Sequence, residues 1–273
     1  MRLWPEAADD YSEALQSGAS TSQPQWWGVS ALSHYTGREA MFRRLSEQRR
    51  DQIRRAPIEP QWMLLRDLAA CGEAMSEIEF REFVALARDW LREPAPAGPP
   101  PPHHLGRRAR GRGPGFAGAA DRSPRHNPFG RAVHPDNTPF CMRQYVTAMT
   151  HLRAREWDEA IALFSAAAQD PRWPSKHLVH APMALAHFRN GDVGQAVEAL
   201  DRSDSTLRRR LSSTGDWPLD GIAIPWFDLL EGLLVNSEAS ELIRGAASPL
   251  NEELGQLRLE SLKLLDAASN TPL

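Results

Sequence analysis

Hydrophobic side chains recur along this chain at helical spacing, and large residues alternate with small ones on one face. The first example is Trp4, Ala7, Tyr11 and Ala14, which follow one another at steps of three, four and three residues. This spacing places all four side chains on one side of an α-helix. No segment shows the strict two-residue alternation that a half-buried strand requires. The pattern therefore predicts an all-α fold.

Gly, Pro, Ser and Thr residues interrupt the helical pattern and set the bounds of the predicted helices. These helices fall into two regions, residues 1–93 and residues 139–273. In the first region the predicted helices are 4–17, 25–35, 38–55, 59–72 and 77–92. In the second region they are 140–154, 157–169, 176–189, 192–203, 205–212, 220–235, 237–245 and 250–268.

The two helical regions are separated by residues 94–138, whose composition differs from that of the rest of the chain. Pro, Gly and Arg dominate, and seven arginines against Asp121 and Asp136 give a net charge of 7 − 2 = +5. With few aliphatic residues, this segment cannot bury enough apolar surface to offset the entropy of ordering it. We therefore predict a disordered, basic, Pro/Gly-rich linker. An alternative function for the same Arg/Gly-rich composition is contact with RNA.

The second helical region contains an internal repeat. Ala160 aligns with Ala196 and Phe164 with Leu200, so the offset is 196 − 160 = 36 residues. The positions that carry the pattern are Ala148, Trp157, Ala160, Phe164 and Ala167 in the first unit and Ala184, Gly191, Ala196 and Leu200 in the second. Helix–turn–helix units with a period close to this one resemble the tetratricopeptide repeat (TPR). The resemblance implies a short solenoid of helix hairpins, in which small residues let paired helices approach to about 8–10 Å.

The opening helix matches the second helix of the same repeat, through Trp4, Ala7, Tyr11 and Ala14. We therefore expect residues 1–93 to be a degenerate TPR-like region that starts inside a repeat. Residues 139–273 are expected to combine TPR-like repeats with C-terminal capping helices. The order of elements also resembles the TPR-rich C-terminal regions of bacterial serine/threonine kinase or WD40 multidomain chains. A closing helix pair is typical there, and residues 225–243 match its pattern.

In the TPR family, the first helix of each unit lines a groove that receives a peptide. The matching positions here are Met142, Tyr145, Met149, Leu152, Leu178, Ala181, Leu185 and Phe188. Seven of these eight side chains are large and apolar. Two interpretations remain open: the stripe binds an apolar peptide, or neighbouring helices of the chain bury it. We favour burial, because an exposed apolar stripe of this size is a liability in a monomer.

Motifs for catalysis or cofactor binding are weak in this sequence. Gly113, Gly115 and Gly118 form a G-x-G-x-x-G pattern, but no predicted strand precedes it and no predicted helix follows it. The sequence contains neither the protein-kinase signature motifs nor a Gly-x-Ser-x-Gly elbow. Cys71 and Cys141 each lie in an apolar helical pattern, where a thiol usually acts as a small hydrophobic group. We therefore expect no enzyme activity, no cofactor and no metal site.

The composition is ordinary for a globular protein, with 41% hydrophobic residues, 25% charged residues and a net charge of −3. Because no apolar run has the length of a membrane span and no signal peptide is evident, we expect a cytoplasmic protein without membrane contact. The favoured function is a non-catalytic protein–protein interaction scaffold with a protein or peptide partner. One alternative is a regulatory remnant of a kinase/WD40–TPR signalling protein. The other is an RNA-contacting adaptor that works through the linker, although the overall charge argues against nucleic acid as a partner.

Overall fold

A computed structural model describes residues 4–21, 26, 28–55, 61–92, 140–171, 173, 175–213, 226–256 and 259. Within these residues every regular element is a helix, which confirms the all-α fold class. The predicted linker, residues 94–138, lies outside the described residues.

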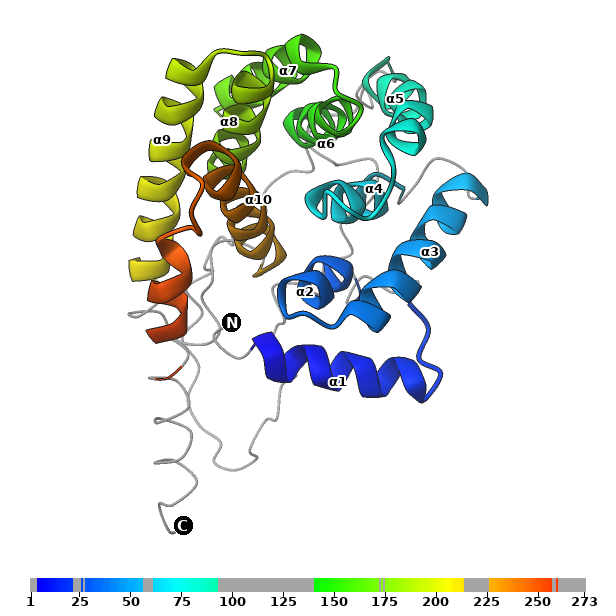
Figure 1. Cartoon of the computed structure of the whole chain (residues 1–273). Helices are drawn as coiled ribbons and strands as arrows, with labels where there is room; N and C mark the ends of the chain where they lie inside the picture. Colours follow the sequence, from blue (N-terminus) through cyan, green and yellow to red (C-terminus); the bar gives the residue numbers. More distant parts are fainter. Residues whose placement is uncertain are drawn as a thin grey trace, which may run out of the picture.

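The described helices follow one another in a curved array (Figure 1). The first region contains α1 (Trp4–Gln16), α2 (Val29–Tyr35), α3 (Glu39–Arg55), α4 (Gln61–Ala70) and α5 (Glu77–Arg92). The second contains α6 (Phe140–Arg153), α7 (Trp157–Gln169), the 3₁₀ helix η3 (Lys176–Val179), α8 (His180–Arg189), α9 (Val193–Ser213) and α10 (Trp226–Arg244). Residues 250–256 form a further helical segment after α10.

The helices alternate between two layers. Helices α2, α4, α6, α8 and α10, which we call the inner helices, each pack against the next member of their own series. Helices α1, α3, α5, α7 and α9, the outer helices, each pack against the inner helix that follows in the sequence. Helix α10 also packs against α2 and α4, so it reaches across the inner side of the array. Figure 1 shows the outer helices around the periphery and α10 enclosed by the curve.

Three hairpin turns, α2–α3, α6–α7 and α8–α9, have the same backbone geometry. Each contains one residue with positive φ: Gly37 at 70°, Arg155 at 61° and Gly191 at 88°. In each turn, the N–H of this residue donates to the carbonyl three positions earlier, and the next N–H donates to the carbonyl five positions before itself. This pattern is the Schellman motif that ends a helix at a left-handed residue. The second and third turns are 191 − 155 = 36 residues apart, which is the offset of the sequence repeat.

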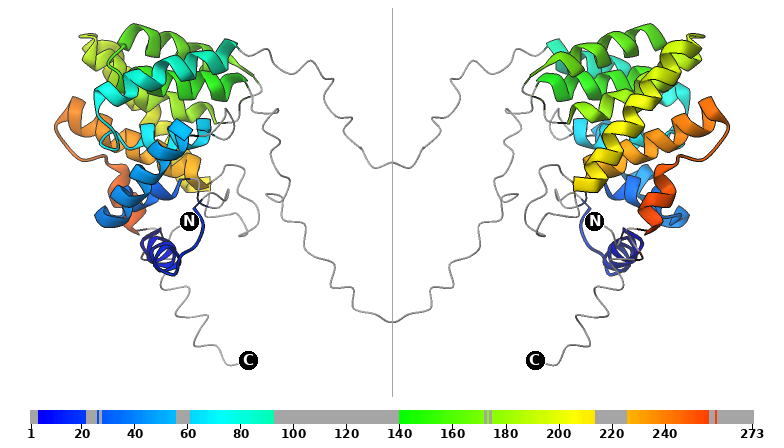
Figure 2. Two further views of the ribbon diagram at one scale, coloured as in Figure 1. Left: turned by 90° about the vertical axis from the view of Figure 1, so that its right-hand side faces the viewer. Right: turned by 90° about the vertical axis from the view of Figure 1, so that its left-hand side faces the viewer.

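The two helical regions share one hydrophobic core. A single cluster of buried side chains extends from Trp4 on α1 to Leu250 after α10. Helix α6 lies against both α4 and α5, although the chain between α5 and α6 is long. Figure 2 shows the helices of the first region, blue to cyan, packed directly against those of the second. Neither region therefore buries its apolar face without the other.

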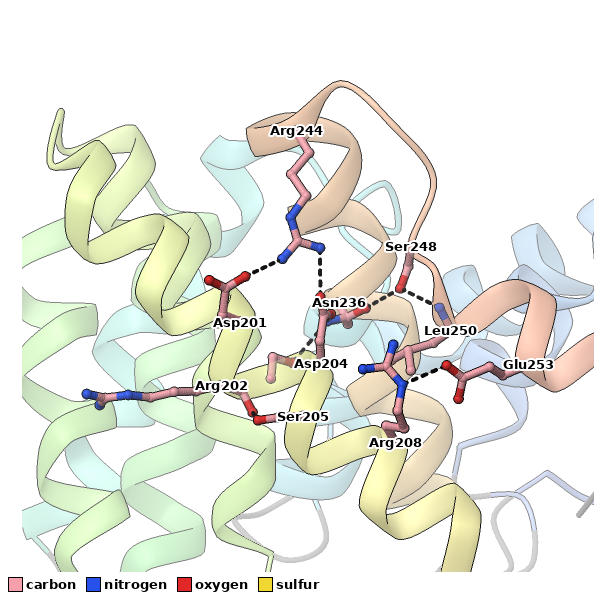
Figure 3. Close-up of polar contacts among 11 residues, drawn as sticks. Asp201, Arg202, Asp204, Ser205, Arg208, Asn236, Arg244, Ser248, Leu250 and Glu253 are labelled. Atoms are coloured by element: carbon pink, nitrogen blue, oxygen red, sulfur yellow. Dashed lines mark hydrogen bonds and ion pairs between the residues drawn. The ribbon is translucent and has the colours of Figure 1, made fainter.

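The structure corrects two predicted breaks between helices. The predicted helices 192–203 and 205–212 are the continuous helix α9. The described parts of those predicted at 220–235 and 237–245 are joined in α10, and residues 220–225 lie outside the described residues. The two predicted breaks fall at Asp204 and Asn236, and Asp and Asn are residue types that favour caps and turns. Here the Asn236 side-chain amide donates to Asp204 Oδ1 at 2.8 Å and accepts from Ser248 Oγ at 2.6 Å (Figure 3). These polar groups pair between helices and leave the backbone ladder intact.

Most of the repeat-packing positions lie in the core. Trp4, Ala148, Ala160, Phe164, Ala167, Ala184, Ala196 and Leu200 are buried. Ala7, Tyr11, Ala14 and Trp157 are half-buried, and Gly191 is exposed at its turn. The large–small alternation of the sequence is thus packed against neighbouring helices over most of its length.

Replacing Ala160 by Trp tests the packing of α7. The side chain of Ala160 is fully buried, so an added ring must displace its neighbours, and overpacking of this kind costs about 1–3 kcal/mol. We expect Ala160→Trp to lower the free energy of unfolding by this amount in urea denaturation followed by circular dichroism. Ala162→Trp, on the exposed face of the same helix, is the control and should change it by less than about 0.5 kcal/mol. Equal effects at the two positions would contradict the packing.

Candidate functional site

The predicted groove residues lie mainly in the interior. Six of the eight are buried and two are half-buried. The buried six are Tyr145, Met149, Leu152, Leu178, Ala181 and Leu185, and the half-buried two are Met142 and Phe188. Inner helices α4, α6, α8 and α10 contact one another at this level, so the chain itself covers most of the stripe. These six residues therefore offer no open apolar groove to a peptide.

A buried ionic network joins α4 to α10. The guanidinium of Arg66 donates from Nε to Glu231 Oε2 at 2.6 Å and from Nη2 to Asp228 Oδ1 at 2.5 Å. All three side chains are at most 4% exposed. The remaining carboxylate oxygens are also bonded, since the hydroxyls of Tyr145 and Ser175 donate to Glu231 Oε1 and Asp228 Oδ2, at 2.7 and 2.5 Å. Every oxygen of the two acids therefore has a partner.

The network positions α10 and leaves little room for chemistry. Burial raises the pKa of Glu231, and Asp228 raises it further, while Arg66 opposes both effects. Burial also raises the pKa of Tyr145 well above its ordinary value. The void beside Arg66 measures about 10 Å³, which is room for one water molecule at most. A saturated network beside such a small void is a structural anchor.

A second buried ion pair connects α2, α3 and α4. The carboxylate of Asp67 lies 2.9 Å from Arg49 Nε and accepts a hydrogen bond from Ala31 N at 3.1 Å. The Ala31 N–H belongs to the first turn of α2, where a negative charge is favourable. Arg49 also donates to Ser30 Oγ and to the carbonyl oxygen of Trp26. This pair fixes the start of α2 to the two helices that follow it.

His177, at the start of η3, is a buried titratable side chain close to the Arg66 network. It is 3% exposed, and neither ring nitrogen has a hydrogen-bond partner within the described part of the chain. Burial lowers its pKa to about 4, and Asp228 opposes this shift. The nearby positive groups Arg210, Arg66 and His180 lower the pKa further. The imidazole is therefore neutral at pH 7.

A cleft of about 360 Å³ opens near the carboxyl ends of α6 and α8, beside α10. Its volume is within the range of ligand-binding pockets. The lining comes from the α4–α5 loop, α5, the α6–α7 hairpin, α8 and α10. The residues are Gly72, Met75, Glu77, Phe80, Leu152, Arg153, Arg155, Trp157, Leu185, Arg189 and Glu238. The cleft combines apolar and charged walls.

Three arginines on the cleft wall differ in how they are held. Arg153 Nε donates to the carbonyl oxygen of Ala69 at 2.8 Å, and its Nη1 and Nη2 bind both oxygens of Glu238 at 2.6 and 2.7 Å. Arg155 Nε lies 2.6 Å from Glu77 Oε2. The Arg189 side chain is exposed and makes no hydrogen bond or ion pair with the described residues. The cleft therefore contains one saturated, one partly occupied and one unoccupied guanidinium.

Because Gly72 has no side chain, the guanidinium of Arg153 can lie directly against the α4–α5 loop. A Cβ atom at this position would be 2.7 Å from Arg153 Nη1, which is closer than real Cβ contacts come. The α4–α5 loop thus passes directly over the guanidinium because residue 72 has no side chain. The contact brings the loop, α6 and α10 together on one side of the cleft.

Of the predicted site residues, Leu152, Trp157 and Leu185 line the cleft. Sequence analysis did not single out the three arginines. One signal was present in the repeat, since Arg153 and Arg189 are 189 − 153 = 36 residues apart and occupy equivalent positions. Their role was hidden because arginine is frequent throughout this chain.

Other kinds of site were sought in the described residues. No group of three or more His, Cys, Asp or Glu side chains there could hold a metal ion. Cys71 and Cys141 are buried thiols outside any disulfide, and burial raises the pKa of Cys71 well above its ordinary value. Among the described helices, none combines the length and apolar character needed to cross a membrane.

Comparison of the chain with protein-family models, with curated proteins and with solved structures found no match in any of the three. The geometry of the described residues is therefore the basis for the functional argument below.

Arg66→Ala should be strongly destabilising, because it leaves Asp228 and Glu231 buried without a counter-charge. Removing one partner of a buried ion pair costs about 3–5 kcal/mol. We expect a loss of this size in the free energy of unfolding, measured by urea denaturation. The variant that combines Arg66→Met with Asp228→Asn and Glu231→Gln carries no unpaired charge and should lose less. If Arg66→Ala loses no more free energy of unfolding than the triple variant, the role of the network is contradicted.

Because His177 is buried in its neutral form, we predict that the protein loses stability in acid. Above its unfolded pKa of 6.5 the histidine is neutral in both states, so the free energy of unfolding has its full value. The free energy of unfolding then falls as the pH drops from 6.5 toward the folded pKa of about 4. The difference corresponds to about 3 kcal/mol at most. We expect the unfolding free energy of the wild type to fall more steeply between pH 7 and pH 4 than that of His177→Leu. Parallel pH profiles for the two proteins would disprove the assignment.

Proposed function

We propose that this chain is a non-catalytic protein–protein interaction scaffold built on TPR-like helix pairs. The order of helix contacts is the observation that carries the proposal. From α1 to α10, each outer helix packs on the inner helix that follows it, and each inner helix from α2 packs on the next inner helix. Repeat proteins stack in this way because each unit contacts its neighbours, and they use the resulting extended surfaces to bind other proteins.

The hairpin turns support the TPR-like assignment. The α6–α7 and α8–α9 turns are offset by 191 − 155 = 36 residues and share one hydrogen-bond pattern. Relative to the turn, the small pair Ala148 and Ala160 corresponds to Ala184 and Ala196 in the next hairpin. The α2–α3 hairpin has the same turn, but Ser30 and Phe42 occupy these two positions, so it is a degenerate unit.

The cleft favours binding over catalysis. Its lining residues include no hydroxyl, thiol or imidazole, so the side chains that most often act as nucleophile and base are absent from it. Its two carboxylates, Glu77 and Glu238, are each paired with an arginine. A partner segment can contact the apolar wall and the exposed guanidiniums without any covalent step. Because the chain covers most of the inner stripe, we place the partner-binding surface at this cleft.

Site-specific photo-crosslinking tests the scaffold function. Ile78 is 70% exposed and follows Glu77 at the rim of the cleft. A chain with p-benzoylphenylalanine at position 78, irradiated in the cells of origin, should form a covalent adduct with a discrete partner protein. The same group at position 162, on the exposed face of α7, is the control and should not form this adduct. Identical adduct patterns at both positions, or no protein adduct at position 78, would reject the proposal.

A further inference from the structure

Arg155 has an unfavourable backbone conformation at the wall of the cleft. It is the one residue other than glycine with positive φ in the described part of the chain. The equivalent positions in the other two hairpin turns are Gly37 and Gly191, which adopt this conformation without cost. A side chain at a left-handed position lowers stability, and such strain concentrates at functional sites. The fold therefore places an arginine where glycine would be the more stable residue.

The strained residue carries an oriented and accessible guanidinium. Its Nε lies 2.6 Å from Glu77 Oε2, and the side chain remains 66% exposed. Glu77 is itself held by Arg81, at the next turn of α5. The carboxylate therefore restrains the guanidinium without burying it, and the group stays available to a second anion.

Arg189 adds a second available charge. It is equivalent to Arg153 in the preceding hairpin, but Arg153 is saturated by Glu238 and the carbonyl of Ala69. No described residue binds the guanidinium of Arg189 as Glu238 and the Ala69 carbonyl bind that of Arg153. The cleft lining therefore has three arginines against two glutamates, a net charge of 3 − 2 = +1. The positive excess is associated with Arg155 and Arg189.

The remaining walls are apolar. Met75, Phe80, Leu152, Trp157 and Leu185 all line the same cleft, and the ring of Trp157 is half-buried. Met75, Phe80, Leu152 and Leu185 are at most 6% exposed, so Trp157 offers the main accessible apolar surface to a ligand. The two glutamates disfavour a polyanion such as a nucleic acid, since its further charges would face Glu77 and Glu238. A peptide with one carboxylate beside apolar side chains has no such conflict.

We infer that the cleft binds a short segment of a partner protein in which a Glu or Asp is flanked by apolar residues. The carboxylate pairs with Arg155 and Arg189, and a flanking side chain packs against Trp157. The inference rests on the proposed scaffold function and names the chemistry of its partner. It also gives a reason for the strained turn, because a glycine at position 155 would remove one of the two available guanidiniums.

Binding of defined peptides tests this inference. The probes are fluorescein-labelled peptides Gly-X-Glu-X-Gly, with X as Leu, Val, Phe or Trp, and a matched set in which Gln replaces Glu. Fluorescence anisotropy with the full chain should show at least one Glu peptide that binds tenfold or more tightly than its Gln counterpart. Equal affinities for the two sets, or no binding of any Glu peptide, would overturn the inference.

Arg155→Gly separates function from stability. Glycine suits the left-handed backbone, so this variant should fold and its melting temperature should rise by about 2 °C. Its affinity for the Glu peptide should nevertheless fall at least fivefold, as should that of Arg189→Gln. Arg202→Gln is the matched control, because Arg202 is exposed on α9 and points away from the polar network in Figure 3. A lower melting temperature, or unchanged affinity, for Arg155→Gly would overturn the inference.

The peptide experiment and the crosslinking experiment test different claims, so the failure of one can be told from the failure of the other. If a partner is crosslinked but the Glu and Gln peptides bind with equal affinity, the scaffold function is retained and the inference that the partner segment is acidic is rejected. Glu-selective binding without a crosslinked protein at position 78 removes the scaffold function and shows an acidic-ligand site of another purpose.

Discussion

The paired charge of Arg66 is the constraint on which the closed form of this helical array depends. Its guanidinium lies between Asp228 and Glu231 with almost no exposure, and 162 and 165 residues of chain separate the partners. A charge in such surroundings is tolerated only when it is fully paired and hydrogen-bonded. The network therefore specifies one position for α10 against α4. An apolar contact of the same area would allow more freedom to slide.

Helix α10 is held by polar contacts on both sides. Its acids bind Arg66 on α4 and Arg153 on α6, and toward α9 it uses Asn236 and Arg244, which bind Asp204 (Figure 3). Ser248, after the helix, donates to the same Asn236. The polar side chains of α10 must therefore meet several partners on different helices at the same time. This explains how α10 can belong to the stack and still cross its inner side.

The position of α10 also decides where a partner can bind. Because it approaches α2 and α4, most of the apolar stripe on the inner helices lies in the core. The space that remains lies near the helix ends, where Arg153 bridges the carboxyl end of α4 and Glu238 on α10. The equivalent arginine of the next hairpin, Arg189, has no such use within the described residues. The same repeat position thus serves stability in one unit and is available for binding in the next.

The sequence by itself determined the all-α class and nearly all helix bounds from α1 to α8, because periodicity and turn residues act over a few neighbouring positions. It did not determine the continuity of α9 and α10, since Asp204 and Asn236 resemble caps until their partners across the interface are known. Only the tertiary structure paired Arg66 with Glu231 and placed Arg155 beside the cleft. Those outcomes depend on how the stack curves and on which distant side chains meet, and no local pattern in the chain contains that information.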